Sequence, residues 1–183
     1  MLPSYIVTSF ALRDVNERFV DAKKKFDSLV KLKPRKGSVI TQNTAHITLK
    51  RTFYPKIGVD EEVIMAALSG VRFKPIPIFA NKLSVFRSKK FGNILVALVN
   101  DNSRLMELYD ELTGAIDQYI EYEAKEFVPH LSILYNLPRN RIKEARSYTE
   151  KNILPVFYLL DNFSLLKDTG VVKERVLVKG YYP

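Results

Sequence analysis

The chain has 183 residues, room for one domain or two very small lobes that share a cleft. Hydrophobic residues make up 46% and charged residues 27%, which is typical of a globular protein and excludes wholesale disorder. The chain has no cysteine, which excludes disulfides, thiolate metal sites and cysteine nucleophiles. Its net charge of +9 favours partners that carry phosphate. Because no apolar run reaches the length of a membrane span and residues 1–10 lack a signal-peptide pattern, we expect a monomeric cytoplasmic protein without membrane contact.

The positive charge is concentrated in the first third of the chain. Residues 1–56 hold twelve Lys and Arg against four Asp and Glu, whereas residues 57–183 hold seventeen against sixteen. Within the second part, residues 101–126 carry eight acids and two bases. The basic run can be a solvated helix face and loop, or a rim that steers phosphate groups toward a site, and the sequence leaves both interpretations open.

The predicted elements begin with a strand over residues 5–12 (YIVTSFAL), which are mostly β-branched and aromatic. Asp14 is a candidate N-cap with Glu17 completing a capping box, and apolar residues at alternating steps of four and three predict a helix that ends before Pro34. Residues 39–53 predict the next strand. One of its faces carries Thr44, His46, Thr48 and Lys50, and the other carries Ala45, Ile47 and Leu49.

A short helix capped by Asp60 is predicted next, with a core-facing side made of Val63, Ile64, Ala67, Leu68 and Val71. The remaining predicted elements, in chain order, are strands 74–86 and 93–100 joined by a basic loop, a helix that starts at Asn102 or Ser103, a strand over 127–137, a helix over 140–151, and a closing hairpin of 154–167 and 171–182. The order of strand, helix, histidine-bearing strand, helix and two strands occurs twice, which indicates one unit used twice.

The two histidines of the chain occupy matching contexts. They read His46-Ile47-Thr48-Leu49 and His130-Leu131-Ser132-Ile133, each a histidine, an apolar residue, a hydroxyl and an apolar residue. Ser and Thr are only 19 of the 183 residues, so a hydroxyl two places after both histidines is an uncommon coincidence. The paired pattern therefore favours a shared function over two unrelated structural histidines.

The spacing has a chemical meaning, because side chains of a strand repeat every two residues. In each motif the imidazole and the hydroxyl project from the same face, while the apolar residue between them anchors the strand in the core. One imidazole can remove a proton while the other donates one, and the hydroxyls can bind the oxygens of a phosphate between them. A zinc site is disfavoured, because the histidines are 84 positions apart and no HExxH or HxH spacing occurs.

These residues resemble the 2H phosphoesterases, which include RNA 2',3'-cyclic phosphodiesterases and bacterial 2'-5' RNA ligases. HITL and HLSI match both copies of the family signature, and the resemblance extends over nearly the whole chain, including the opening strand YIVTSFAL, the segment LSVFRSKKFGNILVALV between the motifs, and FVPHLSIL around the second. It implies an α+β fold of two pseudo-symmetric lobes of antiparallel sheet with outer helices and a central cleft. It also implies one domain over residues 1–183 whose two lobes are intertwined, each with one motif.

Carried over to this sequence, the resemblance implies that His46 and His130 are the acid and base, and that Thr48 and Ser132 bind phosphate. Many relatives have a small or apolar residue where Lys50 follows the first motif. Lys50 is therefore an extra phosphate contact or a sign of a different substrate, and we favour the contact because Lys50 shares the predicted face of His46 and Thr48.

Two further candidates lie at the start of the basic loop. Phe86 can stack on a nucleobase and Arg87 can fork onto a phosphate, although a core phenylalanine followed by an exposed arginine fits the sequence equally well. The acids at residues 60–62 are interpreted as favouring a helix N-terminus through its dipole, and not as metal ligands.

We therefore expect a phosphodiesterase that needs no metal or cofactor and acts on RNA ends with a 2',3'-cyclic phosphate or on 2'-5' linkages. The symmetric motifs leave open which histidine is the base. The alternatives are a phosphodiesterase for small signalling nucleotides, a module that binds nucleotides or RNA without turnover, and a basic RNA-binding domain with coincidental histidines.

Overall fold

The computed structural model of the chain describes residues 3–11, 13–30, 44–88, 92–100, 103–122, 126–168 and 175–183. Its helices are α1 (Arg13–Val30), α3 (Glu61–Ser69), α4 (Ser103–Ile116) and α5 (Ile142–Asn152), with short 3-10 turns η1 (Asp117–Tyr119) and η2 (Arg139–Arg141). Its strands are β1 (Ser4–Phe10), β2 (His46–Pro55), β3 (Ile76–Ser88), β4 (Gly92–Asn100), β5 (Ile120–Tyr122), β6 (His130–Leu137), β7 (Val156–Leu160), β8 (Phe163–Asp168) and β9 (Arg175–Tyr181). None of the described helices is long and apolar enough to cross a membrane.

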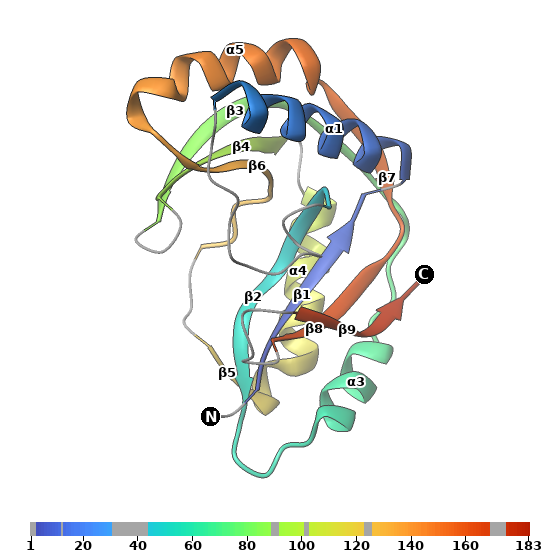
Figure 1. The fold of residues 1–183 in the computed structure, drawn as a ribbon. Helices are drawn as coiled ribbons and strands as arrows, with labels where there is room; N and C mark the ends of the chain where they lie inside the picture. Colours follow the sequence, from blue (N-terminus) through green and yellow to red (C-terminus); the bar gives the residue numbers. More distant parts are fainter. Residues whose placement is uncertain are drawn as a thin grey trace.

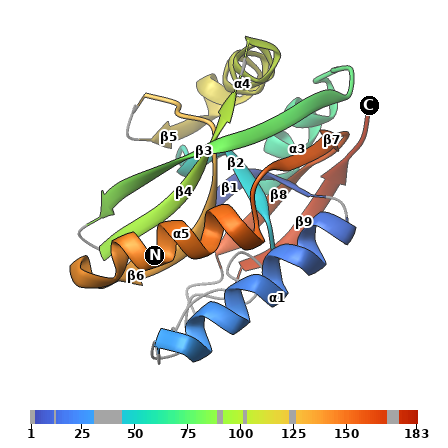
Figure 2. The same ribbon diagram turned by 90° about the horizontal axis from the view of Figure 1, so that it is seen from above.

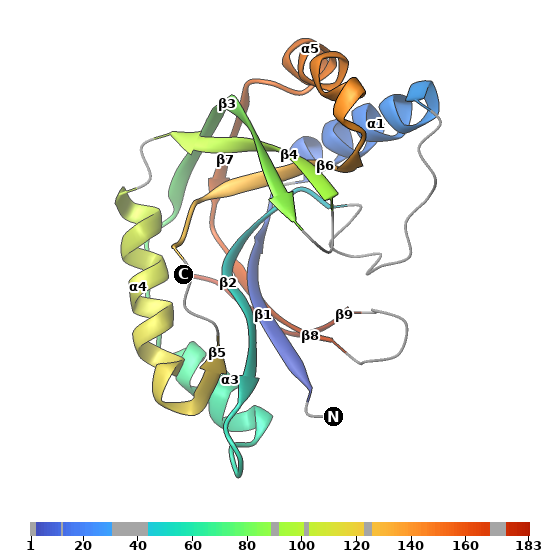
Figure 3. The same cartoon turned by 90° about the vertical axis from the view of Figure 1, so that its left-hand side faces the viewer.

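The strands form one curled antiparallel sheet in the order β7-β3-β4-β6-β2-β1-β8-β9, with β5 added beside β2 (Figure 3). The two histidine-bearing strands, β2 and β6, are neighbours at the centre of this order. The strands β4, β3 and β7 continue outward from β6, and β1, β8 and β9 continue outward from β2. The prediction of an α+β fold built on antiparallel sheet is confirmed.

The helices form two groups at opposite ends of the sheet (Figure 1). α1 packs on α5 and contacts β6 and β7, and the two helices lie side by side in Figure 2. α4 packs on α3 and contacts β2. α1 follows β1 in the chain but packs against the half of the sheet that contains β6 and β7. α4 follows β4 but packs against the half that contains β2. The division of the chain into one domain of two intertwined lobes stays a prediction.

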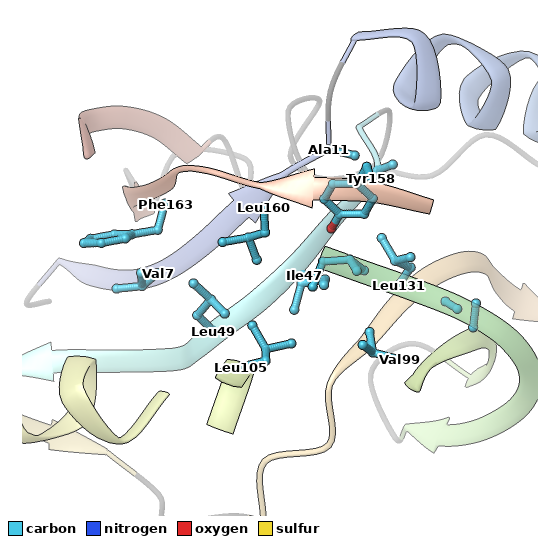
Figure 4. Close-up of a cluster of buried hydrophobic side chains, with 14 of the residues drawn as sticks. Val7, Ala11, Ile47, Leu49, Val99, Leu105, Leu131, Tyr158, Leu160 and Phe163 are labelled. Atoms are coloured by element: carbon cyan, nitrogen blue, oxygen red, sulfur yellow. The ribbon is translucent and has the colours of Figure 1, made fainter. Parts of the chain in front are cut away.

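The apolar residues of both motifs lie in the main hydrophobic core. Ile47, Leu49 and Leu131 are at most 1% exposed, and Figure 4 shows them in one cluster with Leu105 of α4. Full burial of such a side chain contributes about 1.5–3 kcal/mol. The predicted alternation along β2, with Ala45, Ile47 and Leu49 facing the core, is confirmed.

The caps and the core-facing side of the helices differ in detail from the prediction. α1 begins at Arg13, so Asp14 lies inside its first turn and is not the N-cap; Glu17 instead accepts a hydrogen bond from Arg13 Nε at 2.8 Å. Asp60 does occupy the N-cap of α3 with extended backbone, but its side chain makes no capping hydrogen bond. Val63 is 39% exposed, because Ile64 and Leu68 already fill the core-facing side of this short helix.

The acid Glu61 in the first turn of α3 has specific partners. Its carboxylate accepts a hydrogen bond from the Tyr5 hydroxyl at 2.7 Å and pairs with Lys167 at 2.8 Å. Burial, followed by the hydrogen bond to Glu61, raises the pKa of Tyr5 to about 12. These contacts tie α3 to β1 and β8.

The C-terminal strands also differ from the prediction. Residues 154–167 form two strands, β7 and β8, because the chain breaks at Asp161 and Asn162. β7 pairs with β3 at one end of the sheet, whereas β8 pairs with β1 on the other side of the molecule. The predicted closing hairpin is confirmed as β8 paired with β9. Its turn is predicted around residues 168–170, of which 169 and 170 lie outside the described residues, as do residues 39–43 and residues 89–91 of the basic loop.

Candidate active site

The two motifs meet where β2 pairs with β6. Ile47 and Leu131 are direct partners in this antiparallel pair. Because antiparallel partners advance in opposite directions, Thr48 lies beside His130 and His46 lies beside Ser132. These four side chains project from the face opposite to the two buried apolar residues, so each imidazole lies across from the hydroxyl of the other motif.

Both histidine rings are held by the same local hydrogen bond. His46 Nδ1 lies 2.8 Å from the carbonyl oxygen of Thr44, and His130 Nδ1 lies 2.6 Å from that of Val128. A carbonyl oxygen only accepts, so Nδ1 carries the hydrogen in both rings and Nε2 is the nitrogen that gains and loses a proton. The residue two places before each histidine thus orients the ring and sets its tautomer.

An aromatic ring contacts each histidine. Phe10 lies 6.3 Å from His46 between ring centroids, and Phe86 meets His130 at 4.8 Å in an edge-on arrangement. Phe86, for which the sequence leaves base stacking and a core position open, packs against the imidazole. Arg87, the next residue of β3, is exposed and is not among the residues that line the pocket described below.

The surroundings of His130 favour its neutral form. Burial lowers its pKa from the ordinary value of 6.5, and the charge of Arg51 lowers it further, while the bond to the Val128 carbonyl acts in the opposite direction. A neutral imidazole whose Nδ1 already donates to a carbonyl has Nε2 available as a base.

A pocket of about 80 Å³ extends from this end of the site. It brings together four of the predicted site residues, which are Thr48, Lys50, Phe86 and His130. His46 and Ser132 are not part of its lining. The volume is several times the roughly 10–15 Å³ that one water needs, so the pocket has room for a small polar group.

Lys50 is the most deeply buried charge of the site, with 2% of its surface exposed. Its Nζ donates to Thr113 Oγ1 at 3.3 Å and lies 3.4 Å from the ring centroid of Tyr122 and 5.7 Å from that of Tyr109. Burial lowers the pKa of Lys50, and the carboxylate of Asp117 opposes this shift. The ammonium thus lies against aromatic faces, which attract a cation.

The pocket is also lined by Arg51, Tyr109 and Tyr122, none of which is predicted from the sequence. Strict alternation places Arg51 on the face opposite to Lys50. In the structure, however, β2 has one extra residue between Lys50 and Phe53 relative to β1, a bulge that allows consecutive side chains to reach one site. Tyr109 comes from α4 and Tyr122 from β5, so no local pattern signals them.

A second pocket, of about 430 Å³, lies between residues 72–76 and α4 and contains none of the predicted site residues. Over the described ranges, no group of three or more His, Asp or Glu side chains is placed to hold a metal ion.

Comparison with known proteins finds one matching family model and several similar solved structures. The family model of the 2'-5' RNA ligase superfamily matches residues 19–171. Escherichia coli LigT in complex with 3'-AMP is 13% identical, with 100% of this chain and 98% of LigT covered and a TM-score of 0.66. TT0787 of Thermus thermophilus is 14% identical, with 98% and 97% covered and a TM-score of 0.64. Kluyveromyces marxianus Usb1 with uridine monophosphate is 10% identical, with 96% and 97% covered and a TM-score of 0.52. At these identities the likeness shows the fold, and no curated protein matches the chain.

Proposed function

Since the chain belongs to the 2'-5' RNA ligase superfamily, the 2H phosphoesterases, we propose that it is a phosphodiesterase. Its substrates are RNA ends with a 2',3'-cyclic phosphate or 2'-5' linkages, and His46 and His130 are its acid–base pair. One observation carries the proposal. The Ile47–Leu131 pairing places each imidazole across from the hydroxyl of the other motif, and both Nδ1 atoms are bonded to backbone carbonyls. The likeness to LigT with 3'-AMP and to Usb1 with uridine monophosphate supports a nucleotide substrate.

In the proposed reaction, a water molecule attacks the phosphorus atom of the cyclic ester. The Nε2 atom of one histidine takes the proton of the water, and the Nε2 atom of the other donates a proton to the ribose oxygen as its bond to phosphorus breaks. The product is a ribose hydroxyl beside a 2'-phosphate. His130 suits the part of the base, because burial and Arg51 lower its pKa.

The hydroxyls of Thr48 and Ser132 have a different part. As donors to the non-bridging oxygens, they hold the tetrahedral phosphorus between the imidazoles and stabilise the charge that develops there. No step of this scheme requires a metal ion or a cofactor.

The test is a hydrolysis panel with the purified protein, with and without EDTA. The substrates are 2',3'-cyclic mononucleotides, RNA with a cyclic phosphate end, 2'-5' oligoadenylate and cyclic dinucleotides, and H130A is the control. The proposal expects EDTA-resistant cleavage of one of the first three substrates, with loss of activity in H130A. Cleavage of cyclic dinucleotides alone would assign the chain to signalling nucleotides. Tight mononucleotide binding without any cleavage would make it a binding module, and abolition by EDTA would contradict the metal-free mechanism.

A further inference from the structure

The acid–base scheme makes no use of the buried ammonium group of Lys50. An ammonium has three N–H donors, and one of these bonds Thr113 Oγ1. Tyr109 and Tyr122 present aromatic faces to the ammonium, with ring centroids 5.7 and 3.4 Å from Nζ. A buried cation is costly unless a counter-charge or hydrogen-bond acceptors compensate it, so Lys50 suits an anionic group brought by a ligand.

The acidic side chains near Lys50 do not occupy the position of an anionic partner for its ammonium group. Asp117 opposes the lowering of the Lys50 pKa, but its carboxylate is engaged in a hydrogen bond with Tyr122, which raises the pKa of the tyrosine. Glu126 also lines the pocket, where it is exposed, and it forms no ion pair with the described cations. Arg51 adds a second positive charge to the lining.

The pocket also has a definite position relative to the reacting atoms. Thr48 and His130 line it, whereas His46 and Ser132 do not, so in the proposed reaction it lies beside the scissile phosphate and not over it. Lys50 is two residues beyond Thr48 along β2, and both side chains line the pocket although the strand has an extra residue between them relative to β1. Lys50 is therefore placed to meet a group that is covalently linked to a phosphate at Thr48.

The side chains that line the pocket determine what it can hold. The chemistry selects an anion, because the lining presents a buried ammonium, a guanidinium and the hydroxyl of Thr48. A phosphate has the charge and the number of acceptor oxygens for this set of donors.

We propose that the pocket around Lys50 and Arg51 binds a second phosphate of the substrate, the one that links the reacting nucleotide to its neighbour. The preferred substrate is then an RNA end of at least two nucleotides and not a cyclic mononucleotide. This inference rests on the proposed function, whose reacting phosphate lies between the two histidines.

The experiment compares two dinucleotides that both end in a 2',3'-cyclic phosphate. One has an ordinary anionic linkage, and the other has a neutral methylphosphonate linkage, so the pair differs in the charge of the second phosphate alone. We expect kcat/KM to be about tenfold higher for the anionic dinucleotide, the scale of one charge-assisted hydrogen bond. Equal values would overturn the inference while leaving the proposed function intact.

Three variants locate the effect. K50M, whose side chain has similar length and no charge, should reduce the preference for the anionic linkage to about one. E126Q, which removes an exposed carboxylate from the lining, should increase the preference. K82M alters an exposed lysine of β3 outside the pocket and should keep the wild-type preference. Thermal melting shows whether K50M folds, and E126Q supplies the test if it does not. The assignment would be overturned if K50M kept the wild-type preference for the anionic linkage, as K82M should. It would also be overturned if E126Q left that preference unaltered.

A binding measurement separates this inference from the proposed function. The dissociation constants of the corresponding dinucleotides that end in a 2'-phosphate are measured by calorimetry on the wild-type protein, which requires no turnover. If neither cyclic substrate is cleaved and 2'-5' oligoadenylate is not cleaved either, the proposed function fails. A tenfold preference for the anionic dinucleotide in binding would still support the second phosphate site, and equal binding would overturn it.

Discussion

Ile47 of β2 pairs directly with Leu131 of β6, and both side chains are fully buried. Each is the apolar residue between the histidine and the hydroxyl of its motif. A slip of one residue in either strand would turn these apolar side chains out of the core and the imidazole and hydroxyl groups into it. Hydrophobic packing on one face of the sheet therefore fixes the arrangement of polar groups on the other.

The first prediction concerns this pairing. Leu131→Ala removes a fully buried side chain and leaves a cavity, so we expect the free energy of unfolding to fall by about 2–5 kcal/mol. Chemical denaturation followed by circular dichroism measures the loss. Ile57→Ala is the matched control, because Ile57 is 94% exposed and its truncation should change the stability by no more than about 0.5 kcal/mol. Equal stability of the two variants would refute the anchoring role of Leu131.

The second prediction concerns the titration of His130. Burial and the charge of Arg51 lower its pKa, so its ring should lose its proton below the ordinary value of 6.5. Arg51→Gln removes the nearby positive charge and should move the midpoint upward. Ring-proton or nitrogen chemical shifts from NMR, recorded against pH, measure both values. A midpoint above 6.5 in the wild-type protein, or a downward shift in R51Q, would contradict this description of the site.

The same shift has a consequence for stability. Because the unfolded chain binds this proton more readily than the folded chain, the contribution of His130 to stability falls as the pH drops through 6.5 toward the lowered folded value. His130→Gln lacks this titration. As the pH falls from 8 to 5.5, the wild-type protein should therefore lose more unfolding free energy than H130Q does. A difference between the two proteins that is independent of pH would contradict the prediction.

The third prediction concerns the hydroxyls. Thr48→Val and Ser132→Ala preserve most of the packing but remove one donor each, so we expect kcat/KM for the cleaved substrate to fall about tenfold or more in either variant. The conservative changes Thr48→Ser and Ser132→Thr retain the hydroxyl and should recover most of the activity. Wild-type kinetics in T48V and S132A would show that neither hydroxyl contacts the phosphate.

Much of the site could be predicted from the sequence, because its pattern is local. The two-residue period of a strand places His46 and Thr48 on the face opposite to Ile47, and the structure has this arrangement. The apolar spacing of α3 likewise identifies Ile64 and Leu68 as core residues, and both are buried. Local periodicity is sufficient wherever an element has one buried face.

The remaining features depend on contacts between distant parts of the chain. The bulge after Lys50 arises from the pairing of β2 with β1, and it adds Arg51 to the pocket although alternation assigns Arg51 to the other face. Tyr122 reaches Lys50 from β5, a three-residue strand too short to give a periodic signal. The break at Asp161 and Asn162, which sends β7 and β8 to different parts of the sheet, is decided by their pairing partners and not by strand propensity.

The central claim is that His46 and His130 act together as acid and base, and turnover of H46A, H130A and the double variant tests it most directly. Each single variant should lose about 10²–10⁴-fold in kcat on the substrate that the panel identifies, with little change in its melting temperature. The double variant should lose little more than either single variant, because residues that act as one unit are not additive. Wild-type turnover in a folded single variant would contradict the claim, and so would losses that multiply in the double variant.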